Sequence, residues 1–155
     1  MALSSTATVI VLILAMVTTI FDIRTLRIPN PLNFTILVAG LIFGNIVGQQ
    51  PFYWQLFSIV TTYLLMLGIC QSFHRIRGVH GLGLGDVKFT AAAAAWVGLQ
   101  SIPSILMIAS VSGLIIWYIA WFCGMRMDGK TRLPFGPFLS LGLVWVWHSG
   151  PIQFF

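Results

Sequence analysis

Six apolar segments, joined by short connections, constrain the fold of this chain more than any other feature. They span about residues 6–21, 32–47, 52–73, 87–100, 103–123 and 135–147. A helix that crosses a bilayer needs about 20 consecutive apolar residues. The third and fifth segments satisfy this, the first and second are slightly short, and the fourth and sixth are marginal. We therefore predict an all-α, polytopic membrane protein of about six transmembrane helices, with residues 1–155 forming a single domain.

The low charge of the chain supports a lipid environment. Hydrophobic residues make up 58% of the sequence and charged residues only 7%, whereas a typical soluble domain is about 25% charged. A soluble fold with so little charge would expose large apolar patches, so we expect the lipid bilayer to be its main solvent. The net charge of +5 does not indicate a nucleic-acid partner, because the basic residues lie in short connections and form no soluble basic face.

The charged residues fall in three clusters, at residues 22–27, 75–88 and 126–132. By the positive-inside rule all three clusters should be cytoplasmic, which requires an even number of membrane crossings between successive clusters. The fourth segment must then cross despite its length, and both termini should face away from the cytoplasm. Because no basic residue precedes the first segment, it is predicted to be a retained membrane anchor and not a cleaved signal peptide.

The chain has no glutamate and three aspartates, so any carboxylate chemistry must use Asp22, Asp86 or Asp128. Asp22 ends the first segment, and Asp86 precedes the fourth, after a glycine-rich stretch at residues 81–85. The predicted topology puts both at one membrane face, where ionisable groups are costly and are functional candidates. Two such carboxylates cannot both ionise cheaply, so one keeps a proton while the other acts as base. This pair can activate water against an amide carbonyl and protonate the leaving nitrogen.

Other interpretations of the aspartates stay open at this point. Asp86 could be the N-cap of the helix that follows it, and Asp22 could be an interfacial charge paired with Arg24 or Arg27. Asp128 begins an Asp-Gly dipeptide, which is typical of a turn. A non-enzymatic membrane component, such as a small carrier or an assembly scaffold, could use paired carboxylates to bind protons or cations. Carriers commonly place such sites near the bilayer midplane, and the predicted placement at one face argues against transport.

The cysteines and histidines do not indicate a metal site. Cys70 and Cys123 form no CxxC pair, and both are expected to be packed thiols. His74, His80 and His148 lack a persuasive metal-binding spacing, and a tetrahedral site needs about three or four protein ligands. We therefore predict no metal and no cofactor.

Five consecutive alanines occupy residues 91–95. Such a run could form a small-residue face that lets a neighbouring helix approach closely. It could equally reflect helix propensity alone.

Three short motifs resemble those of a known family. Residues 22–30, Asp-Ile-Arg-Thr-Leu-Arg-Ile-Pro-Asn, resemble the first aspartate motif of type IV prepilin peptidases. Residues 83–88, Gly-Leu-Gly-Asp-Val-Lys, match the GxGD motif of the same family, and residues 133–138, Leu-Pro-Phe-Gly-Pro-Phe, resemble a third family segment. The three occur in the expected order. Presenilin-type proteases share a GxGD aspartate but lack the Arg-Ile-Pro-Asn context.

The resemblance implies a membrane aspartic endopeptidase of the bacterial inner membrane. Such an enzyme removes the short basic leader of type IV prepilins or prepilin-like secretion subunits at the cytoplasmic face, commonly after a glycine. Asp22 and Asp86 match the catalytic aspartates of the family. A degenerate member that binds prepilins without cutting them is the further alternative, and the intact motifs argue against it.

Four neighbouring residues are expected to bind substrate or to support the site. Gly83 and Gly85 would let backbone approach the substrate or would permit a bend beside Asp86. Lys88 could tune the aspartate or contact substrate, or its ammonium could simply reach the interface. Asn30 could support the site, or it could only help to start the second helix.

One departure concerns the longer family members, which carry an extra cytoplasmic region with paired cysteines. Many of these also methylate the new N-terminus. This chain begins almost directly in its first segment and has no cysteine cluster, so it resembles the compact members. No soluble segment obviously binds S-adenosylmethionine, and N-methyltransferase activity is therefore not expected.

Overall fold

A computed structural model describes residues 2–47, 50–77, 83–124 and 134–152 of the chain. The predicted all-α architecture is confirmed, because these residues form six α-helices and one short 3-10 helix, with no strand. The α-helices are α1 (Ala2–Thr25), α2 (Asn30–Ile46), α3 (Phe52–Arg77), α4 (Leu84–Val97), α5 (Ile102–Phe122) and α6 (Gly136–Ser149), and the 3-10 helix η1 (Leu99–Ser101) precedes α5.

Among the described residues, three stretches are long and apolar enough to cross a membrane: Leu3–Thr25, Phe52–Ile76 and Leu99–Phe122. The first is longer than predicted, because the helix continues past the last apolar residue through its charged end. The α2 helix is apolar but has only 17 residues. With 14 residues each, α4 and α6 are about 21 Å long, which is shorter than the hydrocarbon core of about 30 Å. The structure is that of a polytopic membrane protein.

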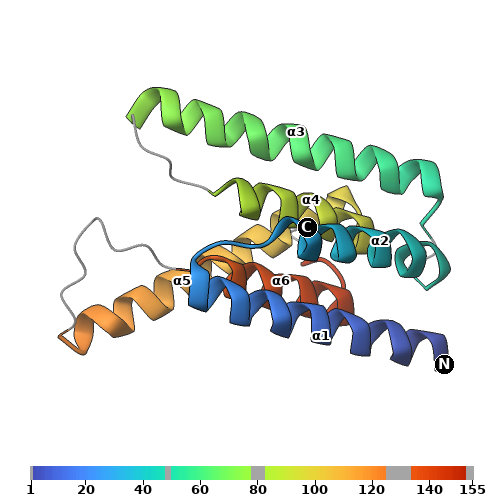
Figure 1. The fold of residues 1–155 in the computed structure, drawn as a ribbon, viewed down its shortest axis with the longest axis horizontal. Coiled ribbons are helices and arrows are strands. Elements are labelled where there is room, and N and C mark those ends of the chain that lie inside the picture. The colour runs from blue at the N-terminus through green and yellow to red at the C-terminus, as the bar shows by residue number, and fades with distance from the viewer. Residues whose placement is uncertain (1, 48–49, 78–82, 125–133, 153–155) are drawn as a thin grey trace.

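The two 14-residue helices, α4 and α6, lie between longer helices. α4 packs mainly between α2 and α3, while α6 packs mainly between α1 and α5, and contacts between α4 and α6 join the two groups (Figure 1). From Val87 to Val97 every residue of α4 except Lys88 is buried. A helix surrounded by protein in this way does not have to match the thickness of the lipid, so the length of α4 is compatible with its central position.

The alanine run of α4 is a packing surface. Residues 91–95 are all at most 5% exposed, and the facing helix α2 contributes Gly40 and Gly44. A Cβ on Gly40 would lie 2.7 Å from Cδ1 of Trp96 and 2.8 Å from Cβ of Ala95. Small residues on both helices therefore bring α2 and α4 into close contact, which decides between the two interpretations of the run in favour of packing.

Two buried side chains add hydrogen bonds to this contact. The indole N–H of Trp96 donates to the carbonyl oxygen of Ile36 over 2.9 Å. Gln55 of α3 is fully buried, and its amide nitrogen donates to the carbonyl oxygens of Gly40 and Ala95 at 3.3 and 3.0 Å. Buried side-chain hydrogen bonds of this kind hold helices together where lipid offers no polar partner. The α2–α3–α4 group is thus fixed by both close packing and polar bonds.

The ends of the helices place the two aspartates. In Figure 1, α1, α3 and α5 run toward the left side of the molecule, and α2, α4 and α6 run back from it. Asp22 lies one turn before the end of α1, and Asp86 lies in the first turn of α4. Both aspartates are therefore at one end of the bundle, as the charge pattern predicts.

Candidate active site

Asp22 is a buried carboxylate bonded to another helix. It is only 4% exposed, and its Oδ2 accepts a hydrogen bond of 2.7 Å from the backbone N–H of Gly136. The side chain of Arg24 is exposed, as is that of Arg27. The interpretation of Asp22 as an interfacial charge paired with these arginines is therefore wrong.

The start of α6 has a free donor for this carboxylate. Helix N-termini present N–H groups that have no partner within the helix. Pro137 has no N–H, and the N–H groups of the next two residues donate to the carbonyl oxygen of Phe135 at 3.1 Å. Gly136 keeps the remaining N–H, which Asp22 accepts. The positive end of the helix dipole also favours an anion at this position.

Gly136 also makes room for Asp22. A Cβ on Gly136 would lie 2.8 Å from Oδ2 and 2.9 Å from Cβ of Asp22, which is closer than real Cβ contacts. Any larger residue would push the carboxylate away from the α6 N-terminus. Sequence reasoning did not single out Gly136 as a site residue, although it lies inside the third motif, which was the available signal.

A tight turn leads from α1 to α2. Leu26 adopts a φ of 52°, a left-handed conformation that is uncommon for residues other than glycine. The hydroxyl of Thr25 lies within 2.9 Å of the carbonyl oxygens of Phe21 and Arg27, so it can donate to either one. This turn ends α1 just after Asp22 and brings the buried side chain of Ile28 toward α4.

Asp86 is the third residue of α4, whose N-cap is Gly83. The alternative interpretation of Asp86 as the N-cap is wrong, because the helix begins at Leu84 and Gly83 holds the N-cap position. Its carboxylate accepts a hydrogen bond from the backbone N–H of Gly83, so it still contributes to capping. α4 is not one of the three candidate membrane spans.

The environment of Asp86 favours the protonated carboxyl. Burial raises the pKa of Asp86 most, and the charge of Asp22 raises it further, to about 6, against the lowering effect of the Gly83 N–H. An effect of Asp22 on Asp86 means that the two carboxylates are near enough to repel each other. The fold has thus brought together two side chains that are 64 positions apart in the sequence.

The GxGD turn rests on the start of α2. A Cβ on Gly85 would lie 3.4 Å from the backbone nitrogen of Ile28, so the two segments are in van der Waals contact. The amide nitrogen of Asn33, which is 5% exposed, donates to the carbonyl oxygen of Gly85 at 3.3 Å. Sequence reasoning missed Asn33. A lone asparagine inside an apolar segment was the signal that could have identified it.

Lys88 and Asn30 are brought together by the fold. The ammonium of Lys88 donates to the side-chain oxygen of Asn30 over 2.8 Å, at an exposed position. This bond links α4, two residues beyond Asp86, to the first residue of α2. Both residues thus connect the two aspartate motifs, which fits a supporting role.

The remaining candidates lie elsewhere. Cys70 is buried and Cys123 is exposed, so the prediction of packed thiols holds for Cys70 alone. Within the described ranges no three histidine, cysteine or acidic side chains converge as metal ligands. His80, Asp128 and Leu133 lie outside the described residues.

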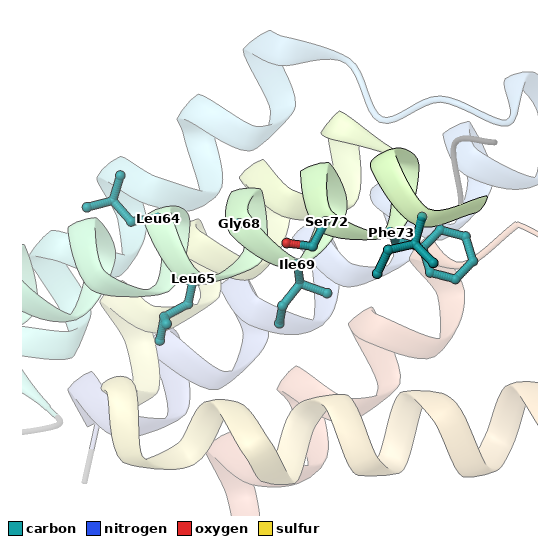
Figure 2. A pocket seen from close by; sticks show the side chains of 7 residues that line it. Leu64, Leu65, Gly68, Ile69, Ser72 and Phe73 are labelled. Atoms are coloured by element: carbon teal, nitrogen blue, oxygen red, sulfur yellow. The ribbon is translucent and has the colours of Figure 1, made fainter. Parts of the chain in front are cut away.

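An apolar depression runs along one side of α3 (Figure 2). It is open and shallow, and no carboxylate lines it. Its lining residues are Leu64, Leu65, Gly68, Ile69, Ser72, Phe73 and Ile76. Apolar side chains on the outside of a membrane-spanning helix are expected to face lipid.

Comparison with known proteins identifies relatives. A prepilin leader peptidase/N-methyltransferase of Burkholderia pseudomallei (strain 1026b) is 34% identical over 124 residues, which cover 78% of this chain and 39% of the relative. One from Pectobacterium carotovorum is 33% identical over 136 residues, covering 86% and 47%. One from Escherichia coli K12 is 32% identical over 123 residues, covering 79% and 54%.

The chain thus spans between 39% and 54% of the length of these relatives. No solved structure matches it. Residues 9–118 match the sequence model of the Type IV leader peptidase family, and this stretch contains both Asp22 and Asp86. Because the match covers more than half of the sequence, the chain belongs to the Type IV leader peptidase family.

Proposed function

We propose that this protein is a membrane aspartic endopeptidase that removes the leader peptides of type IV prepilins or prepilin-like secretion subunits. Asp22 and Asp86 are its catalytic pair. The observation that carries the proposal is that two carboxylates from separate family motifs lie at one end of the bundle, where burial first, and then the charge of Asp22, raise the pKa of Asp86 to about 6. Two carboxylates that cannot both ionise are the arrangement that aspartic proteases use.

The chemistry follows from one shared proton. The ionised carboxylate takes a proton from water, and the resulting hydroxide attacks the carbonyl carbon of the scissile amide. The protonated carboxyl gives its proton to the carbonyl oxygen, which yields a tetrahedral diol. As the C–N bond breaks, one hydroxyl of the diol gives its proton to the ionised carboxylate and becomes the carbonyl of the new carboxylic acid, while the leaving nitrogen takes the proton of the other carboxyl. The pair returns to its starting state, and one water is consumed for each bond cut.

The site is proposed to act at the cytoplasmic face of the bacterial inner membrane. Basic residues cluster near both aspartates in the sequence, and the positive-inside rule assigns such clusters to the cytoplasm. The family of leader peptidases and the names of the relatives support prepilin-like substrates. We do not extend the methyltransferase activity in those names to this chain, since it spans about half of their length.

A co-expression cleavage assay tests the proposal. Wild type, Asp22→Asn and Asp86→Asn are each expressed with a prepilin-like substrate from the same genome, and the new N-terminus is read by mass spectrometry. We expect a cut after the leader glycine with wild type only. The third aspartate offers a matched control, because Asp128→Asn should leave cleavage intact.

The assay also measures the amount of each variant in the membrane, so that a loss of activity is not confused with a loss of protein. Normal cleavage by either Asp22→Asn or Asp86→Asn would rule out the proposed pair. No cleavage by wild type across the prepilin-like proteins of that genome would point to a protein that binds prepilins without cutting them.

A further inference from the structure

We propose that the two carboxylates have fixed and different roles: Asp22 stays ionised and takes the proton from water, while Asp86 holds the shared proton and delivers it. In this assignment Gly136 is a positioning residue that acts through Asp22. The inference rests on the proposed function for its chemistry, but the protonation states can be measured without any substrate.

The first support is the partner of Asp22. An N–H to carboxylate bond of 2.7 Å has the length of a charge-assisted hydrogen bond, which is roughly twice as strong as a neutral one. The donor is the first N–H of α6, and it comes from a different helix at the positive end of its dipole. This N–H has no competing acceptor in α6, so it is available to stabilise the anion.

The second support is the environment of Asp86. Its partner is the N–H of Gly83, the cap of its own helix, and this bond does not outweigh the combined effect of burial and of the charge on Asp22. An ionised Asp22 therefore helps Asp86 to hold its proton up to about pH 6. The bond to Asp22 crosses a helix interface, whereas the bond to Asp86 stays within its own turn, and Asp86 also experiences the repulsion of the Asp22 charge.

The cations that the structure describes on the packed helices are bonded elsewhere or exposed. Lys88 on α4 is bonded to Asn30, and the described part of α6 contributes only His148, at its far end. The described residues of α2 include no charged or histidine side chain. The remaining charged or histidine side chains that the structure describes on α1, α3 and the α1–α2 connection are all exposed: Arg24, Arg27, His74 and Arg75.

The composition makes a direct test possible. With three aspartates and no glutamate, a chain labelled with carbon-13 at the aspartate carboxyl gives three NMR signals. The purified full chain is measured in detergent micelles across a pH series, and Asp22→Asn, Asp86→Asn and Asp128→Asn assign the signals. As pH falls, we expect the Asp86 signal to move to the protonated position first, while the Asp22 signal stays at the ionised position. Protonation of Asp22 before Asp86 would overturn the assignment.

Gly136→Ala tests the positioning role. The added methyl must displace the Asp22 carboxylate, so the NMR signal of Asp22 should move. In cleavage, kcat should fall by at least about tenfold with KM changed by less than about twofold, since a displacement of 1 Å can cost roughly a hundredfold in rate. Gly68→Ala is the matched control, because a Cβ there meets nothing within 4 Å.

The NMR titration and the Gly136→Ala variant test different parts of the proposal. An unshifted Asp22 signal and full kcat in Gly136→Ala would remove Gly136 from the mechanism. If Gly136→Ala fails to fold, the wild-type titration still decides the order of protonation. If the titration gives the expected order but no prepilin-like substrate is cut, the proposed function has failed and the assignment of protons has not.

Discussion

Gly136 donates its backbone N–H to the carboxylate of Asp22 over 2.7 Å, across 114 positions of the sequence. The bond joins the first aspartate motif at the end of α1 to the third motif at the start of α6. The N–H of Gly136 has no acceptor within α6, and the buried carboxylate of Asp22 requires a hydrogen-bond donor, so the bond satisfies both groups. The α1–α6 interface therefore holds the site together as well as the fold.

Asp86→Asn should stabilise the protein at neutral pH while it abolishes cleavage. The folded-state pKa of Asp86 is raised from its ordinary value of 3.8 to about 6, so the folded state binds more protons than the unfolded state between these values. The stabilising effect of this proton is present below 3.8 and is lost as pH rises through about 6. We expect a melting temperature a few degrees higher than wild type above pH 7, measured in detergent.

The gain should shrink as the pH falls and vanish near about pH 4, where wild type also carries a neutral side chain. Asp128→Asn, measured in parallel, should show no such pH-dependent gain. A gain of equal size at every pH would mean that the charge of Asp86 is not the cause.

Gly40→Val should separate α2 from α4 and destabilise the bundle. Side-chain atoms of Ala95 and Trp96 lie 2.8 and 2.7 Å from the position of a Cβ on Gly40, and overpacking typically costs about 1–3 kcal/mol. We expect a lower melting temperature and a loss of cleavage in proportion to the unfolded fraction. Gly113→Ala should be tolerated, because its nearest neighbour, Phe138, lies 3.5 Å from a Cβ there.

Lys88→Met and Asn30→Leu should each reduce cleavage modestly, because both remove the same hydrogen bond. The bond of 2.8 Å between the two side chains is exposed, and such bonds contribute about 0.2–1 kcal/mol. Each single variant should lower the cleavage rate by up to about fivefold, and the double variant should lose little more than either one. Fully additive effects in this double-mutant cycle would show that the two residues act separately.

Asn33→Leu should lower both the melting temperature and kcat, although Asn33 belongs to none of the three motifs. It removes the donor to the carbonyl oxygen of Gly85, next to Asp86, and an unpaired buried polar group costs about 1–3 kcal/mol. We expect a melting temperature several degrees lower and a reduced kcat. Asn45→Leu is a useful comparison, because Asn45 bonds to the carbonyl of Gln50 at the other end of α2 and should leave kcat unchanged.

Much of the membrane architecture could be predicted from the order of the residues. Apolar segments and charged connections are set by local transfer free energies, which do not depend on the partners of a helix. The positions of the six helices and the shared end of Asp22 and Asp86 follow from this pattern and from the motifs, whereas the bond between Asn30 and Lys88 does not. Helix ends were less predictable, because α1 continues through its charged residues and α4 begins before Asp86.

The sequence by itself therefore determined that the chain is a helical membrane protein with two aspartates at one end. Only the tertiary structure decided that α4 is enclosed, that Gly40 faces Trp96 and that Gly136 is the donor to Asp22. Membrane helices are apolar on every side, so their sequences carry little information about which side meets protein and which meets lipid. The role of Gly40 or Gly136 can be assigned only when the residue that it contacts is known, and in both cases that residue lies in another helix.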